Sequence, residues 1–167
     1  VAQNADVMNL SLGAYPVPPS VDTDLTVDMH ARAAERAYQQ GSLIVASAGN
    51  DAVNLDTDGD VVSLPNQVPG FMSISATGPI GFEALGSTNP NRTASGLDAE
   101  SHLPALYTSY GANEIDVSAP GGNAGGGRGD QWFYDLVFSA VPADQGQTDF
   151  KAGTSMSAPQ VTGAAAL

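Results

Sequence analysis

A serine in a setting suited to nucleophilic catalysis lies in the segment 153–159 (GTSMSAP). The glycine permits a turn that would deliver Ser155 to the start of an alanine-rich helix, where the helix dipole stabilises negative charge. A serine at a helix start is far more often an N-cap than a nucleophile. The segment also differs from the G-x-S-x-G elbow, because Ser157 stands where the second glycine belongs. Ser155 therefore needs a partner elsewhere in the chain.

Asn50 could be that partner, because it ends the segment 46–50 (ASAGN) after a run of strand-forming residues. An asparagine at the carboxyl end of a strand can direct its side-chain NH₂ into the crevice where open α/β sheets bind ligands. Acyl transfer requires such a donor for the oxyanion of its tetrahedral intermediate. The chain has no cysteine, so a side-chain nucleophile of this kind would be an oxygen.

Four segments together resemble the subtilisin-like serine proteases, the subtilase family: NLSLGA (9–14), VASAGN (45–50), DVSAPGG (116–122) and GTSMSAPQVTGAAAL (153–167). They occur in the family's order and at approximately its spacing. The resemblance implies an α/β fold, a three-layer sandwich with a mostly parallel central sheet and the active site at the carboxyl ends of the strands. It implies that residues 1–167 form a single incomplete catalytic domain, corresponding to the C-terminal two thirds or so of the family's domain.

The resemblance also implies a role for each matching residue. Ser155 would be the nucleophile of peptide hydrolysis, and Asn50 would supply the oxyanion-hole side chain beside the backbone N–H of Ser155. One wall of the pocket for the residue before the cleaved bond would be Ser11, Leu12 and Gly13, which would also pair with the substrate backbone as an added strand. The opposite wall would be Ser47, Ala48 and Gly49. Both walls are small or apolar, which favours a medium to large apolar side chain in the pocket.

Two parts of the catalytic triad have no counterpart in this sequence. The family's chain order is Asp, His, Ser, and its Asp-Thr/Ser-Gly and His-Gly-Thr-His motifs do not occur here. His30 falls in a predicted helix and His102 in a predicted loop, so we expect neither to be the base. We expect the isolated chain to be inactive, with the missing N-terminal part as its partner. The alternatives are a non-catalytic peptide-binding module with the same fold, or an acidic structural α/β domain.

An acidic loop is a candidate Ca²⁺ site. Oxygen-bearing side chains alternate at Asn54, Asp56 and Asp58, followed by Gly59 and Asp60, as at the opening of a calcium loop. The bidentate glutamate of that motif is missing, so a solvated acidic loop is the alternative. The family resemblance implies a different cation site near residues 64–71, in which Asp116 would take part.

The elements that would position these residues can be read from hydrophobic periodicity. The segment 5–12 predicts a strand, and 23–40 predicts a helix with apolar residues at four-residue spacing, Asp22 or Thr23 as its cap, an Asp28–Arg32 pair and Gly41 as its stop. The segment 43–48 predicts a buried strand, which completes a β-α-β unit and implies a parallel sheet. Further strands are predicted at 71–77 and 114–118, a strand or hairpin at 132–141, and a helix at 155–167.

Composition limits the possible functions. The chain of 167 residues carries 18 acidic and 5 basic residues, a net charge of -13, which repels nucleic acids and anionic membrane surfaces. Hydrophobic residues make up 42%, enough for a core, but no apolar run approaches the roughly 20 residues of a membrane span. The excess of aspartate predicts a salt-adapted source. The family resemblance implies a secreted or extracellular protein that acts on peptide or protein substrates.

Overall fold

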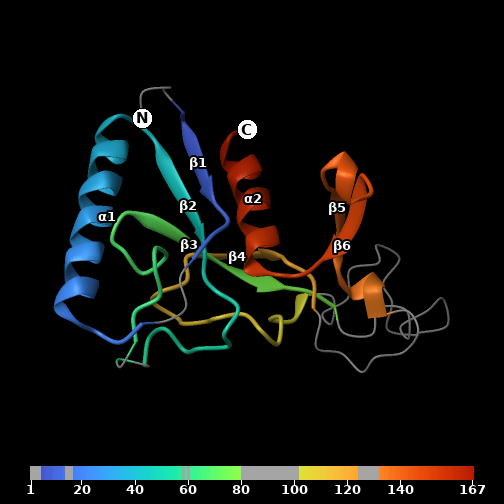
Figure 1. Ribbon diagram of the computed structural model, residues 1–167, viewed down its shortest axis with the longest axis horizontal. Coiled ribbons are helices and arrows are strands. Elements are labelled where there is room, and N and C mark those ends of the chain that lie inside the picture. The colour runs from blue at the N-terminus through green and yellow to red at the C-terminus, as the bar shows by residue number, and fades with distance from the viewer. Residues whose placement is uncertain (1–4, 14–16, 58, 60, 80–101, 124–131) are drawn as a thin grey trace.

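A four-stranded parallel sheet forms the centre of the computed structural model, which describes residues 5–13, 17–57, 59, 61–79, 102–123 and 132–167 (Figure 1). The strands lie in the spatial order β1-β2-β3-β4. Val7 pairs with Leu43, Ile44 with Phe71, and Ile74 with Val117. The strands are β1 (Val7–Leu10), β2 (Leu43–Ser47), β3 (Phe71–Thr77) and β4 (Val117–Pro120). The predicted parallel sheet is confirmed.

Two helices cover the two faces of this sheet. On one face, Ala34 and Ala37 of helix α1 (Val21–Gln39) pack with Ile44 of β2. On the other face, Ala158 of helix α2 (Thr154–Ala165) packs with Val45 and Ile74. Neighbouring residues of a strand point to opposite faces, so Ile44 and Val45 belong to different core layers. The protein is therefore the predicted three-layer α/β sandwich.

Helix α1 begins two residues earlier than the sequence predicts. Its cap is Ser20, whose Oγ accepts a hydrogen bond from the backbone N–H of Thr23 at 3.1 Å. The prediction of Asp22 or Thr23 as the cap is therefore wrong. Thr23 instead lies in the first turn, where its hydroxyl donates to the carbonyl of Pro18. At the other end, Gly41 has a φ of +80°, which strains other residues, and stops the helix as predicted.

Strand β4 begins at Val117, three residues later than predicted. The backbone N–H of Glu114 points to the carboxylate of Asp56 rather than to β3. The Asp116 carboxylate accepts the N–H of Ser73 at 2.8 Å. The Asp116 N–H also donates to the Ser73 carbonyl at 3.1 Å, and the paired register with β3 begins at Val117.

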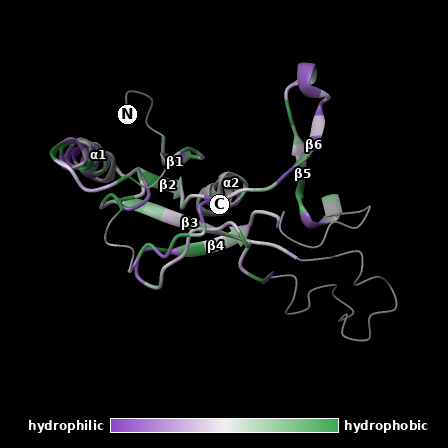
Figure 2. Ribbon diagram, turned by 60° about the horizontal axis from the view of Figure 1, so that its bottom comes forward, coloured by the Kyte–Doolittle hydropathy of each residue, from purple (hydrophilic) through white to green (hydrophobic). Residues whose placement is uncertain are grey.

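The region 132–141 forms the first half of a hairpin. A short 3-10 helix (Trp132–Asp135) leads into β5 (Val137–Ala140), which pairs antiparallel with β6 (Thr148–Lys151). Figure 2 shows this hairpin standing apart from the sheet, beyond α2. Phe150 packs against Phe133 and Phe138 with ring centroids 5.3 and 4.8 Å apart. In the described part of the chain, no helix is long and apolar enough to cross a membrane.

Candidate active site

Ser155 lies in the first turn of α2, directly after a glycine turn that follows β6 and contacts the end of β4. Gly153 precedes the helix with φ 153° and ψ 155°, a conformation that other residues rarely adopt. Its N–H donates to the carbonyl of Gly121 at 2.9 Å. The buried hydroxyl of Ser157 donates to the carbonyl of Ala119, also at 2.9 Å. The carboxyl end of β4 thus fixes the turn that presents Ser155.

The approach of the two segments leaves no room for a side chain at Gly121. A β-carbon at this position would lie 2.6 Å from the β-carbon of Ala76 and 2.8 Å from the carbonyl oxygen of Gly153. The hydroxyl of Tyr107 donates to the carbonyls of Gly121 and Gly122, each at 2.8 Å. Burial of this phenol raises its pKa to about 12, although a backbone hydrogen bond at Gly153 acts in the opposite direction. Tyr107 therefore remains a hydrogen-bond donor at neutral pH.

Ser11 connects the end of β1 to the nucleophile turn. Pro159 lies inside α2 and has no N–H to donate to the Ser155 carbonyl four residues earlier. The Ser11 hydroxyl donates to this carbonyl instead, at 2.9 Å. The Ser155 Oγ in turn lies 3.5 Å from the carbonyl oxygen of Ser11. The two serines, 144 positions apart in sequence, are therefore direct neighbours.

Asn50 is held by the residue that precedes Ser155. Its Oδ1 accepts hydrogen bonds from the backbone N–H of Thr154 at 2.9 Å and from the Thr154 hydroxyl at 3.0 Å. The amide nitrogen must then point away from Thr154. This Nδ2 lies 3.6 Å, and the backbone N of Ser155 lies 3.7 Å, from the position that a β-carbon on Gly153 would take. Two N–H donors thus flank one small space beside Ser155, as oxyanion stabilisation requires.

A cavity of about 380 Å³ opens beside these donors. Of the six predicted wall residues, four line it: Leu12, Gly13, Ser47 and Gly49. The remaining two do not: Ala48 is fully buried, and Ser11 is bonded to Ser155. The Ser47 hydroxyl donates to the Leu12 carbonyl at 3.2 Å, which ties the two walls together.

Three further residues line this cavity that the sequence did not single out: Asp51, Ser63 and Thr154. Asp51 follows the predicted donor Asn50 directly, so its carboxylate could have been noticed from position alone. Ser63 comes from a turn between the bridge at Val62 and β3, and no local pattern marks it. The cavity is therefore more polar than the predicted walls suggest.

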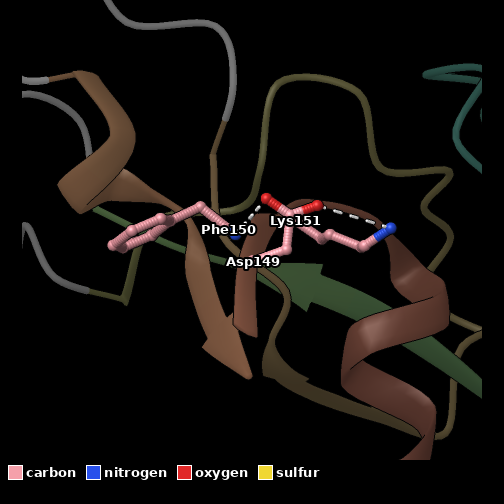
Figure 3. A network of polar contacts seen from close by, with 3 residues as sticks. All are labelled: Asp149, Phe150 and Lys151. Atoms are coloured by element: carbon pink, nitrogen blue, oxygen red, sulfur yellow. Dashed lines mark hydrogen bonds and ion pairs between the residues drawn. The ribbon is translucent and has the colours of Figure 1, made fainter. Parts of the chain in front are cut away.

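A second cavity, of about 610 Å³, also reaches Ser155. The hairpin β5–β6 and α2 form it, with apolar atoms from Val137, Met156 and Pro159. On the hairpin, the Asp149 carboxylate accepts the N–H of Phe150 at 2.8 Å and pairs with the Lys151 amine at 3.6 Å (Figure 3). The half-buried Met156 thus lines the same cavity as Ser155.

Neither histidine lines either cavity. His30 lies on α1, where its Nδ1 is 2.8 Å from the carbonyl oxygen of Thr26 and its ring contacts Phe71. His102 is exposed. Gln160 uses its side-chain NH₂ to donate to the carbonyls of Pro120 and Met156, which ties α2 to the end of β4.

The acidic loop is organised around Asp56. Partial desolvation raises the pKa of this carboxyl, but hydrogen bonds from the backbone of Asn113, Ala112 and Glu114 outweigh it and hold the pKa below 3.8. The Asn54 side chain accepts the N–H of Asp56 at 3.1 Å. Asp56 therefore joins this loop to residues 112–114, and the Asn54 side chain closes a local turn.

The other predicted cation ligands are Asp58, Asp60 and Asp116. Asp58 and Asp60 lie outside the described residues. Asp116 bonds the N–H of Ser73. Within the part of the chain that the structure describes, no three His, Cys, Asp or Glu residues are placed to hold a metal ion. The oxygens of Asp56 face N–H donors with which a cation would have to compete, and Ca²⁺ binding stays a prediction.

The fold, the glycine turn and the Asn50–Ser155 arrangement agree with one protein family. The family model described as "Subtilase family" matches residues 1–167, and the chain belongs to this family.

Several known proteases are similar over nearly the whole chain. The epidermin leader peptide-processing serine protease EpiP of Staphylococcus epidermidis is 27% identical over 97% of this chain and 37% of its own length. Subtilisin DY of Bacillus licheniformis is 31% identical over 97% of this chain and 42% of its own length. A crystal structure of a lanthipeptide protease superposes with a TM-score of 0.70 at 27% identity, over 97% of this chain and 46% of that one. The chain thus spans less than half the length of these relatives.

Proposed function

We propose that this chain carries the nucleophile and oxyanion hole of a serine endopeptidase. The observation that carries the proposal is the hydrogen bond from Thr154 to the Asn50 side-chain oxygen, which leaves the Asn50 amide nitrogen beside the same space as the Ser155 backbone N–H. Membership of the subtilase family supports the same reading. The substrate would be a peptide or protein, as the name of the epidermin leader peptide-processing protease suggests for that protein.

In this reaction the Ser155 Oγ attacks the carbonyl carbon of the scissile peptide bond, and its proton passes to a base. The carbonyl oxygen becomes an oxyanion between Asn50 Nδ2 and the Ser155 N–H. Collapse of the tetrahedral intermediate releases the amine and leaves an acyl-enzyme, which water then hydrolyses. The base must lie within hydrogen-bond reach of Ser155. Neither histidine of this chain lines the cavities at Ser155, so we propose that another part of the protein supplies the base.

Substrate would approach along the ends of β1 and β2. After β1 the chain continues through Ser11, and Leu12 and Gly13 form one side of the cavity. An extended peptide can add to such an edge through backbone hydrogen bonds while every second side chain enters a pocket. A secreted location is part of the proposal. A relative from Arabidopsis thaliana that bears the name "CO(2)-response secreted protease" supports it, at 40% identity over 76 residues.

A fluorophosphonate probe tests the nucleophile in the full-length protein. We expect covalent labelling at Ser155 and peptide turnover, both lost in Ser155→Ala while the melting temperature is retained. Asn50→Ala should lower kcat with little change in KM, because the donor engages the oxyanion more than the ground-state carbonyl. For the corresponding donor in subtilisin, a member of this family, the known loss is about 100- to 1,000-fold.

The same experiment on residues 1–167 alone separates catalysis from binding. We expect no turnover from this chain, since oxyanion stabilisation without a base leaves little activity. If the full-length protein binds peptides but neither labels nor cleaves, the rival function of a non-catalytic peptide-binding module replaces the proposal.

A further inference from the structure

The first turn of α2 lacks one regular hydrogen bond of the helix. In an α-helix, the carbonyl of each residue accepts the N–H of the residue four positions later. Pro159 occupies that position for the Ser155 carbonyl, and proline has no N–H to donate. A proline ring inside a helix also crowds the carbonyl four residues earlier. The carbonyl of the candidate nucleophile therefore lacks its α-helical partner.

The chain at the end of β1 supplies a replacement. Strand β1 and helix α2 lie side by side and contact each other (Figure 1). The hydroxyl of Ser11, which directly follows β1, donates to the Ser155 carbonyl at 2.9 Å. Asn9 lies two positions before Ser11, so its side chain is on the same face of the strand. Two polar side chains of this face are thus placed near the start of α2.

Asn9 fixes the direction in which Ser11 donates. The Nδ2 of Asn9 donates to the Ser11 Oγ at 2.9 Å. A serine hydroxyl has one proton, and an amide nitrogen cannot accept it. Ser11 therefore uses this proton on the Ser155 carbonyl. The other end of the Asn9 amide is also engaged, because its Oδ1 accepts from the hydroxyl of Thr162 on α2 at 3.2 Å.

We propose that Ser11 is a positioning residue for the nucleophile and that Asn9 orients the Ser11 hydroxyl. This inference rests on the proposed function. The backbone of Ser155 would be held at both ends, since its N–H faces the space of the candidate oxyanion hole and its carbonyl is held by Ser11. The direction of the Ser155 Oγ follows from this backbone. Without the Ser11 hydroxyl, the carbonyl could turn and carry the attacking oxygen away from its productive position.

Kinetics of the full-length protein test this role. Ser11→Ala should lower kcat about 5- to 10-fold with KM nearly unchanged, as expected for one lost hydrogen bond that orients a reacting group. Ser11→Thr retains the hydroxyl and should recover most of the rate. A rise in KM at parental kcat would overturn the proposal, because Ser11 would then act on the substrate instead.

Ser42→Ala is the matched control. The Ser42 hydroxyl also donates to a backbone carbonyl, that of Ala5 at 2.6 Å, but Ser42 lines neither cavity at Ser155. Its removal should leave kcat as in the parent protein. An equal fall of kcat in Ser42→Ala and Ser11→Ala would overturn a specific role for Ser11.

A second substitution returns the missing hydrogen bond to the helix. Pro159→Ala restores a backbone N–H four residues after Ser155, so the Ser155 carbonyl would no longer depend on Ser11. In this background, Ser11→Ala should lower kcat less than about 2-fold, because substitutions that act on one group are not additive. Equal losses in both backgrounds would overturn the proposal, since Ser11 would then act elsewhere than on this carbonyl.

Asn9→Asp tests the orientation of the Ser11 proton. An ionised carboxylate only accepts hydrogen bonds, so the Ser11 hydroxyl should turn toward residue 9 and leave the Ser155 carbonyl. We expect kcat to fall as far as in Ser11→Ala, and to fall no further when both substitutions are combined. Parental kcat in Asn9→Asp would overturn the role of Asn9.

Nuclear magnetic resonance reads the hydrogen bond without turnover. Isotopic labels on the carbonyl carbon of serine and the nitrogen of methionine select the peptide bond between Ser155 and Met156, whose peak is absent from Ser155→Ala. The carbonyl-carbon shift of this peak should move upfield in Ser11→Ala and return when Pro159→Ala is added. An unmoved shift overturns the inference whatever the fluorophosphonate result. Absence of labelling together with a moved shift would reject the peptidase proposal and leave Ser11 as the group that holds this carbonyl.

Discussion

The side-chain oxygen of Asn50 accepts the backbone N–H of Thr154 at 2.9 Å, and this hydrogen bond orients the candidate oxyanion donor. The residue that precedes the nucleophile therefore also orients the amide that would serve it. The Thr154 hydroxyl strengthens the link, since it lies 3.0 Å from the same oxygen and accepts the N–H of Gly49 at 3.2 Å. The segment that ends at Asn50 and the nucleophile turn thus meet at this one buried threonine.

Thr154→Val should lower kcat about 10-fold with little change in KM. The substitution keeps the side-chain shape but leaves the Gly49 N–H without its acceptor and Asn50 with one hydrogen bond to residue 154 instead of two. Steady-state kinetics of the full-length protein and its melting temperature measure the two effects. Thr154→Ser retains the hydroxyl and should recover most of the rate. If Thr154→Val turned over like the parent, the orientation of Asn50 would not depend on this hydroxyl.

Mild peroxide should inactivate the full-length enzyme through Met156. Its sulfur lies 3.6 Å from the position of a β-carbon on Gly153, beside the donors of the candidate oxyanion hole. The sulfoxide would place a polar oxygen next to Asn50 and Ser155. Peptide mapping by mass spectrometry alongside residual activity follows the modification, and Met156→Ala should resist peroxide.

Met29 provides the control for this oxidation. It lies on α1 with 72% of its surface exposed, so it should oxidise first, without loss of activity. The variant Met29→Leu should lose activity at the parental rate. Activity loss that follows Met29 oxidation, or that is unchanged in Met156→Ala, would contradict the assignment to Met156.

Asp56→Asn should lower the melting temperature at neutral pH. It should also make the melting temperature fall less steeply as the pH is lowered. The folded-state pKa lies below 3.8, so the carboxylate contributes stability above pH 3.8 and loses it as the pH falls through the folded value. The melting temperatures of Asp56→Asn and the parent should therefore converge as the pH drops below 3.8. The melting temperature of the control variant Asp144→Asn should change with pH as that of the parent protein does. If the melting temperatures of Asp56→Asn and the parent differed by the same amount at low pH as at neutral pH, the Asp56 charge would not be the source of the stabilisation.

Calcium binding by the acidic loop is a separate prediction. Micromolar to millimolar Ca²⁺ should raise the melting temperature of the parent protein, and joint replacement of Asp56, Asp58 and Asp60 by asparagine should remove this rise. Mg²⁺ at equal concentration controls for ionic strength. The four N–H donors that face Asp56 would compete with the ion. If neither Ca²⁺ nor a chelator changed the melting temperature, the loop would bind no Ca²⁺ and would be only a hydrogen-bonded turn.

Salt should stabilise this protein. The net charge is -13, and the two ion pairs found in the described residues, Asp28–Arg32 and Asp149–Lys151, are both exposed. Raising KCl from about 0.1 to 1 M shortens the screening length from about 10 to 3 Å and should relieve repulsion among the carboxylates. The melting temperature should rise by several degrees at pH 7 and by less near pH 4. A flat or falling melting temperature at pH 7 would contradict a salt-adapted source.

Local patterns predicted the elements that carry the site well. The strand at Phe71–Thr77 has its predicted bounds, and the strand before Asn50 ends one residue earlier than expected. These short apolar runs are buried between two helices, so hydrophobicity and turn residues alone define them. The cap of α1 was missed because Ser20 lies in a proline-rich stretch whose link to Thr23 depends on the turn there.

The hydroxyl groups beside Gly49 could not be predicted in the same way. Ser63 and Ser109 lie 46 positions apart, and only the packing of their loops around Gly49 brings their hydroxyls together. Ser11 was predicted as a wall residue, but its hydroxyl bonds the Ser155 carbonyl because Pro159 cannot. Such contacts join residues that are far apart in the sequence, which a pattern along the chain does not reveal.

Helix α2 follows all four strands in sequence, yet it contacts every one of them. A nascent chain that emerges from the ribosome N-terminus first therefore exposes one apolar face of the sheet until residues 154–165 are free. Contacts as distant in sequence as Ser11 and Ser155 form late, since loop closure over such lengths slows folding. The nucleophile thus reaches its partners only in the step that buries the last face of the sheet. No partly synthesised chain ending before α2 can present the assembled site to other proteins in the cell.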